Sequence, residues 1–170
     1  TTDGVSAAEM SELCYQYRYD RRNRLIEKKI PGKGWEYIVY NKLDQPIMTK
    51  DALNPWLFTK YDAFGRVAYT GTATDDRPRE ALQAEAMSDI YAVNYEERAT
   101  ATEIGGKLVS YTNNAMPRAL EKTYTINYYD AYVDTDGLSL PATVMGQPIT
   151  NAVKGLATVG KVRILGTEKW

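Results

Sequence analysis

The feature that most constrains this chain is an internal period of 21 residues. Three pairs, each a tyrosine followed by an aspartate or asparagine, recur at this spacing: Tyr19-Asp20, Tyr40-Asn41 and Tyr61-Asp62. Trp35 and Trp56 keep the same register and are two of only three tryptophans in the chain. A repeat of this length is typical of architectures in which each repeat is one supersecondary unit. We therefore expect an array of small, similar units.

Each unit has the residue pattern of a β-hairpin turn. The first turn position carries a short polar side chain that can accept a hydrogen bond from the backbone two residues further on. The fourth position carries a residue type that tolerates positive φ, as a type I turn followed by a G1 bulge requires. The first positions are Asp20, Asn41 and Asp62, and the fourth positions are Asn23, Asp44 and Gly65.

Strands are predicted on both sides of each turn. Tyr15, Tyr17 and Tyr19 alternate with polar residues, which is the pattern of a half-buried strand. The chain has fourteen tyrosines and two phenylalanines, and tyrosine suits such strands because one ring face packs while the hydroxyl reaches water. The strands predicted before the turns are 15–19, 35–40 and 57–61, and those after the turns are 24–30, 45–49 and 66–72.

The period ends after the third unit. Asp75-Asp76-Arg77-Pro78 has the pattern of a helix start, with an aspartate cap and a proline inside the first turn. Leu82, Ala86, Ile90 and Val93 follow at near-helical spacing, so a helix is predicted over residues 78–91. Further strands are predicted over 108–112, 123–133 and 160–165.

These elements predict a mainly β fold, in which tandem hairpins extend one sheet, with one helix and a return β section. We expect three hairpin units in residues 1–74, a helical insertion and linker in 75–104, and a second β section in 105–170 that continues the repeat array. A single hairpin cannot bury its apolar face, so neighbouring units must cover it. The sequence stops at Trp170 without a polar capping segment and both of its ends look truncated, so we also expect exposed sheet edges that favour self-association.

Composition argues against most catalytic functions and against nucleic-acid binding. The chain has no histidine, the commonest general base and metal ligand, and a single cysteine, Cys14. The net charge is −1, and the cluster of Arg18, Arg21, Arg22 and Arg24 is expected to face solvent beside a turn. No run of eighteen apolar residues is present that could span a membrane.

Two groups of acidic residues are candidate sites. Asp134-Thr135-Asp136-Gly137 begins like a calcium loop, but Met145 stands at the twelfth position in place of a bidentate glutamate, so a surface turn is predicted. The pairs Asp75-Asp76 and Glu96-Glu97 point adjacent side chains to different faces, so capping and solvation are predicted for them. The sequence thus predicts no enzyme, no cofactor, and no catalytic or metal-binding residue.

The tyrosine-aspartate units resemble the YD repeats of Rhs proteins. Residues 61–67 (YDAFGRV) have the family pattern of a Tyr-Asp pair, a turn glycine, an arginine and an apolar strand residue. Residues 19–25 have asparagine in place of the glycine, and residues 40–46 depart from the pattern at three positions. Downstream segments are similar to Rhs-type surface proteins of Bacteroidetes: 79–83, 111–117, 127–130 and 153–158.

The resemblance implies a structural scaffold segment of a large exported protein, secreted or at the cell surface. In this family the YD repeats wind a β-sheet into a hollow shell. The shell encloses a toxic domain in polymorphic toxins and serves adhesion in animal teneurins. The partners implied are neighbouring repeats of the parent chain, whereas the self-cleaving core and the toxin region of the family have no counterpart in this sequence.

A second hypothesis is a cell-surface module that binds carbohydrate or a partner protein through an exposed Tyr/Trp face. Trp35 and Trp56 could form such a platform only if their rings were solvent-exposed and coplanar. Their equivalent positions in successive units instead favour stacking as a core ladder between units. The exposure of these two indoles therefore distinguishes the two hypotheses.

Overall fold

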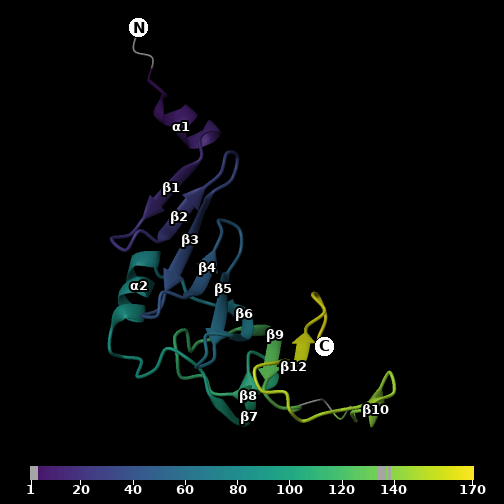
Figure 1. The fold of residues 1–170 in the computed structure, drawn as a ribbon. Coiled ribbons are helices and arrows are strands. Elements are labelled where there is room, and N and C mark those ends of the chain that lie inside the picture. Colours follow the sequence, from purple (N-terminus) through teal and green to yellow (C-terminus); the bar gives the residue numbers. More distant parts are fainter. Residues whose placement is uncertain (1–3, 134–136, 138) are drawn as a thin grey trace.

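The computed structural model describes residues 4–133, 137 and 139–170. Its helices are α1 (Ala7–Leu13) and α2 (Arg79–Met87). Its strands are β1 (Gln16–Tyr19), β2 (Leu25–Lys29), β3 (Trp35–Tyr40), β4 (Pro46–Lys50), β5 (Trp56–Tyr61), β6 (Val67–Ala73), β7 (Arg98–Ile104), β8 (Lys107–Tyr111), β9 (Lys122–Tyr129), β10 (Thr143–Val144), β11 (Gln147–Pro148) and β12 (Ala157–Val162). The fold is mainly β, as the sequence predicts (Figure 1).

Eight strands form one antiparallel sheet in the order β1-β2-β3-β4-β5-β6-β9-β12. The first six strands pair in chain order and include the hairpins β1–β2, β3–β4 and β5–β6. β9 then pairs with β6, and β12 pairs with β9. The chain therefore leaves the sheet after β6 and returns beside the strand that it left (Figure 1).

The turns of these three hairpins share one set of backbone hydrogen bonds. In the first, the N–H of Asp20 donates to the carbonyl of Arg24 and the N–H of Asn23 donates to the carbonyl of Asp20, both at 3.0 Å. The same two bonds close the turns at 41–45 and 62–66. The fourth turn residue has positive φ, as the turn pattern predicts, with 59° at Asn23, 60° at Asp44 and 78° at Gly65.

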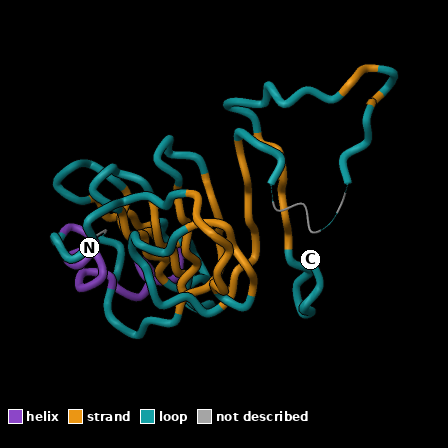
Figure 2. Tube along the Cα trace, turned by 90° about the horizontal axis from the view of Figure 1, so that it is seen from below, coloured by secondary structure: helices purple, strands orange, loops and turns teal. Residues whose placement is uncertain are grey.

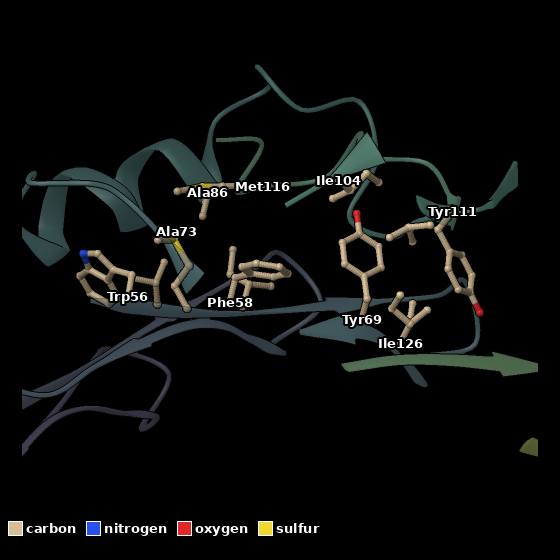
Figure 3. Close-up of a cluster of buried hydrophobic side chains, with 14 of the residues drawn as sticks. Trp56, Phe58, Tyr69, Ala73, Ala86, Ile104, Tyr111, Met116 and Ile126 are labelled. Atoms are coloured by element: carbon tan, nitrogen blue, oxygen red, sulfur yellow. The ribbon is translucent and has the colours of Figure 1, made fainter. Parts of the chain in front are cut away.

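Residues 74–121, which we call the excursion, cover one face of the sheet. α2 packs against β3 and buries Leu82 and Ala86, while the β7–β8 hairpin lies over β9. Figure 3 shows Trp56, Phe58 and Tyr69 of the sheet directed toward this cover. The most buried apolar residues of the sheet are Val39, Met48, Phe58, Ala68, Tyr69, Ala73, Ile126 and Tyr128. The hydrophobic core thus lies between the sheet and the excursion.

The structure has two helices where the sequence predicts one. α1 begins with a capping box formed by Ser6 and Glu9 and buries no residue. α2 ends at Met87, so Ile90 lies beyond it and is 68% exposed. The predicted aspartate cap is also wrong, because Pro78 is the N-cap and no side chain caps the helix. No described helix is long and apolar enough to cross a membrane.

The predicted segment boundaries need correction in the second half of the chain. Residues 75–104, predicted as helix and linker, end in strand β7, whose residues are exposed apart from Ile104. β7 pairs with β8 in a separate two-stranded sheet, so within 105–170 only β9 and β12 join the main sheet. β10 and β11 form another small hairpin on a segment that projects from the body (Figure 2).

Two tyrosines of β1 and the tyrosine just before it lie on the open edge of the sheet. Tyr15, Tyr17 and Tyr19 are 65%, 51% and 56% exposed, so the predicted half-burial is wrong. Among the described residues β1 pairs with β2 alone, and none of the three tyrosines is buried. The alternating pattern indicates a strand correctly, but it does not determine whether another element covers that strand.

Candidate functional site

The turn end of the sheet carries side-chain contacts that recur from hairpin to hairpin. The Asp62 carboxylate accepts hydrogen bonds from the backbone N–H groups of Phe64 and Arg66 through Oδ1, each at 2.9 Å, and from Arg66 Nε through Oδ2, at 2.6 Å. Asp20 makes the equivalent three bonds within its own turn, including one from Arg24 Nε at 2.7 Å. The aspartate therefore closes the turn and orients the arginine.

The oriented arginine reaches the next hairpin. The Arg24 guanidinium binds the carboxylate of Asp44 at 2.6 Å and lies 4.5 Å from the centroid of the Tyr40 ring. Its side chain is 15% exposed, so the prediction that this arginine simply faces solvent is wrong. Arg66 makes the corresponding contacts with the carboxylate of Asp130, at 2.7 Å, and with the Tyr129 ring. An ion pair combined with a cation–π contact is thus repeated across the sheet.

A second set of links, which we call the tyrosine ladder, runs in the opposite direction. In each link the hydroxyl of the last tyrosine of a strand donates to a backbone carbonyl of the preceding hairpin. The three bonds are Tyr40 to Leu25 at 2.8 Å, Tyr61 to Pro46 at 2.9 Å and Tyr129 to Val67 at 3.0 Å. The three acceptors occupy the same position, immediately after the turn, in their hairpins. The ladder therefore aligns neighbouring hairpins at their turn ends.

The second hairpin has glutamine where the others have arginine. Gln45 bonds back to the Asn41 side chain at 2.9 Å, so this turn sends no guanidinium to the third hairpin. α2 contacts this hairpin instead, because the Gln83 carboxamide accepts from the Tyr40 N–H at 3.0 Å and donates to the Tyr40 carbonyl at 2.8 Å. The excursion thus supplies polar contacts at the hairpin that lacks the arginine.

The β9–β12 pair keeps the closing backbone bond of the three turns although its two strands are far apart in the sequence. Tyr129 pairs with Ala157, and the Asp130 N–H donates to the carbonyl of Leu156 at 3.0 Å. Asp130 Oδ1 accepts the N–H of Gly155 at 2.5 Å, and Gly155 has a φ of 85°. Residues 131–154 therefore separate the two sides of a turn that keeps the closing backbone bond, whereas the N–H of Gly155 bonds to the carboxylate of Asp130 rather than to its carbonyl. The sequence analysis missed this equivalence because the interruption destroys the 21-residue spacing.

A cavity of about 420 Å³, which we call the tryptophan pocket, lies between the sheet and the start of α2. Trp56 is only 2% exposed and Trp35 is half-buried, so the two indoles do not form an exposed platform. The Arg18 guanidinium covers the Trp35 ring at 4.4 Å. The pocket is lined by Arg18, Glu27, Trp35, Tyr37, Lys50, Trp56, Asp76, Arg77, Pro78, Arg79 and Glu80.

Three nitrogen atoms on the wall of the tryptophan pocket are buried without a hydrogen-bond partner. They are Trp56 Nε1 and two guanidinium nitrogens of Arg79, Nε and Nη1. Arg79 Nε lies 3.6 Å from a carboxylate oxygen of Glu27. The two side chains therefore form an ion pair, but this distance is too long for a hydrogen bond. Buried donors of this kind leave hydrogen-bonding capacity unused.

No family model, no curated protein and no solved structure matches this chain. The functional assignment therefore rests on the geometry and chemistry of the residues themselves.

A buried ion pair attaches the excursion to the sheet. Lys60 of β5 and Glu96 have side chains that are 1% and 0% exposed. Lys60 Nζ donates to Glu96 Oε1 at 2.7 Å, to Asn113 Oδ1 at 2.8 Å and to the carbonyl of Ala115 at 2.6 Å. Burial lowers the pKa of Lys60 to about 8, and the charge of Glu96 opposes that shift.

Glu96 was predicted to be solvated, and the structure contradicts this. Its Oε1 accepts from the N–H of Ala115 at 3.1 Å, in addition to Lys60. Its Oε2 accepts from Thr112 Oγ1 at 2.7 Å and from the N–H of Asn114 at 2.8 Å. These donors compensate the desolvation of the carboxylate, so the charged pair can remain in the core.

The other acidic candidates do not form a site. Residues 134–136 of the predicted surface turn lie outside the described residues. Within the described part of the chain, no group of three or more Cys, Asp or Glu side chains could hold a metal ion. Asp75 contacts Arg77 through its carboxylate, at 2.7 Å, and does not cap α2.

Proposed function

We propose that this chain is a structural scaffold segment of an exported Rhs/YD-repeat protein, secreted or at the cell surface. Its role is to form part of a shell wall or surface element by adding hairpins edge to edge. The observation that carries the proposal is the tyrosine ladder, which links successive hairpins by the same bond at the same position.

The contacts at the turn end explain why the residues of a YD pattern would recur in such a wall. The aspartate closes the turn, the arginine reaches the next hairpin, and the next tyrosine both stacks under that arginine and bonds back. We interpret Tyr129-Asp130, with Gly155 and Leu156, as a fourth repeat whose turn contains an insertion. Each hydroxyl bond contributes about 1 kcal/mol, which fixes the alignment of neighbouring hairpins.

The free edge of the sheet fits the same proposal. β1 presents two exposed tyrosines, Tyr17 and Tyr19, follows a third, Tyr15, and pairs with β2 alone among the described strands. Unpaired edge strands are templates for further strand pairing. The partner at this edge would be a neighbouring repeat of the parent chain or a second copy of this segment. Sedimentation velocity over a wide concentration range tests the second case, which requires concentration-dependent association.

Hydrogen exchange measured by mass spectrometry tests the scaffold proposal. Tyr61→Phe removes only the hydroxyl that links the third hairpin to the second, and Tyr17→Phe, on an exposed edge residue, is the matched control. We expect Tyr61→Phe to accelerate amide exchange in both hairpins, β3–β4 and β5–β6, and Tyr17→Phe to leave them unchanged. Faster amide exchange in β5–β6 alone, or no change in either hairpin, would contradict the proposal that the Tyr61 hydroxyl stabilises both hairpins.

A second candidate function is binding at the tryptophan pocket. Its aromatic walls and the unpartnered nitrogens of Arg79 and Trp56 favour a ligand that has both an apolar face and acceptor oxygens, such as an acidic sugar. Tryptophan fluorescence titrated with glucuronic acid, and with glucose as the uncharged control, tests this candidate. A saturable change in tryptophan fluorescence with glucuronic acid but not with glucose would favour binding over a purely structural role, provided that Arg79→Gln abolishes the change.

A further inference from the structure

Lys60, Glu96 and Asn113 bring an amine, a carboxylate and a carboxamide together inside the protein. Lys60 Nζ lies 2.8 Å from the carboxamide oxygen of Asn113 and 2.7 Å from the carboxylate of Glu96. We propose that Lys60 and Asn113 form an intramolecular isopeptide bond, with Glu96 as the catalytic residue that carries the proton. This inference is independent of the scaffold proposal.

The three contacts of Lys60 match the requirements of a nucleophilic amine. An ammonium group has three N–H donors, and all three are held by Glu96, Asn113 and the carbonyl of Ala115. Transfer of the proton held by Glu96 leaves a lone pair on Nζ and two N–H groups. Rotation about the Cε–Nζ bond then presents this lone pair to the carboxamide of Asn113, whose oxygen lies 2.8 Å from Nζ.

The reaction balances without an oxidant or a co-reactant. Glu96 accepts a proton from the Lys60 ammonium, and the neutral Nζ attacks Cγ of Asn113. The Nζ–Cγ bond forms, and Glu96 returns the first proton to Nδ2 as the Cγ–Nδ2 bond breaks, which releases ammonia. Glu96 then takes the second proton that Nζ loses in becoming an amide nitrogen and passes it to the ammonia. The products are a Lys–Asn amide and ammonium, and Glu96 is again a carboxylate.

The surroundings favour each part of this step. The amine and the carboxylate are almost fully buried, and burial lowers the pKa of Lys60 to about 8, which makes the neutral amine accessible near neutral pH. Asn113 Nδ2, the leaving nitrogen, donates to the carbonyl of Arg118 at 2.9 Å. Arg118 is exposed, so ammonia departs toward solvent. The Tyr69 ring, 5.9 Å from Nζ, helps to exclude water.

The bond would fasten the excursion to the sheet covalently. Lys60 and Asn113 are 53 residues apart, and the chain between them contains β6, α2, β7 and β8. A cross-link across this loop would keep the cover on the core even when the noncovalent contacts open transiently.

Intact mass spectrometry of the unmodified chain under denaturing conditions tests the proposal. We expect a mass about 17 Da below that of the sequence, the loss of one ammonia. After tryptic digestion, residues 51–66 and 108–118 are expected in one branched species, because an acylated Lys60 is not cleaved. A full sequence mass, with Lys60 cleaved and 108–118 recovered as a linear peptide, would overturn the proposal.

Three variants and one alternative product sharpen the result. Asn113→Ala is expected to show its full sequence mass, whereas Asn114→Ala, a change of the adjacent exposed residue, is expected to retain the loss. A succinimide at either asparagine also releases ammonia but leaves the two peptides separate, so unjoined peptides overturn the proposal whatever the intact mass. Glu96→Gln is expected to prevent the bond, and a branched species in that variant would overturn the role of Glu96.

Discussion

Gly71 of β6 faces β9, the strand with which the sheet resumes after the excursion, and its replacement by alanine tests that junction. A Cβ at this position would lie 1.8 Å from the carbonyl oxygen of Lys122 and 2.8 Å from Cε1 of Phe58. The nearer atom belongs to the backbone of β9, and Gly71 pairs with Thr123 of that strand. The clash with the new Cβ can therefore be removed only if β9 moves away from β6. Overpacking costs about 1–3 kcal/mol, and a backbone clash places Gly71→Ala at about 3 kcal/mol.

Urea unfolding followed by circular dichroism measures this loss of stability. For a chain of this size, about 3 kcal/mol corresponds to a fall in Tm of about 6–12 °C. Gly160→Ala in β12 is the matched control, because the nearest atom to its new Cβ is Asn127 Oδ1 at 3.8 Å. The control is expected to be neutral or more stable by about 0.5–1 kcal/mol. Equal unfolding midpoints for the two variants would refute the described pairing of β6 with β9.

Three further predictions follow from particular contacts. Lys60→Met strands the buried carboxylate of Glu96 and is expected to cost about 3–5 kcal/mol in urea unfolding, a loss that Glu96→Gln in the same chain partly restores. The hydrogen bond from Arg66 lowers the pKa of Asp130 to about 2, below its value of 3.8 in the unfolded chain. Its stabilising contribution is therefore complete above pH 4 and lost as the pH falls toward 2, so Asp130→Asn should unfold with a weaker acid dependence than the parent between those values. A variant that retains Trp56 as its single tryptophan should show weak iodide quenching, because this indole is 2% exposed, and strong quenching would contradict its burial.

The local chemistry of the first 74 residues is strong enough to predict strand positions closely. β3 spans Trp35–Tyr40 as predicted, and the ends of the other strands around the three turns differ from prediction by at most one residue. This accuracy has a physical cause, since the aspartate or asparagine at the first turn position and the positive φ at the fourth are short-range requirements. Burial is a long-range property, and the exposed tyrosines of β1 show that strand periodicity does not predict it.

The Lys60–Glu96 centre was missed because no local pattern identifies it. Glu96 is adjacent to Glu97 in the sequence, and a pair of glutamates is usually solvated. The structure separates them, burying Glu96 against Lys60 and leaving Glu97 exposed. The partners lie 36 residues apart and meet only because the excursion folds back over β5. Such a site could be found from sequence alone only if the return path of the chain were known.

The two long insertions enter the sheet at positions where its repeated contacts do not depend on chain continuity. Residues 131–154 interrupt a turn, yet Asp130 still bonds to Gly155 and to Leu156 across the gap. Residues 74–121 leave after β6, yet the Tyr129 hydroxyl still reaches the carbonyl of Val67. Because each link joins two side-by-side strands rather than two consecutive residues, a hairpin can accept an insertion while its alignment is kept. A sheet built in this way can acquire new surface segments without losing the register of its strands, which is the property that a scaffold for variable parts requires.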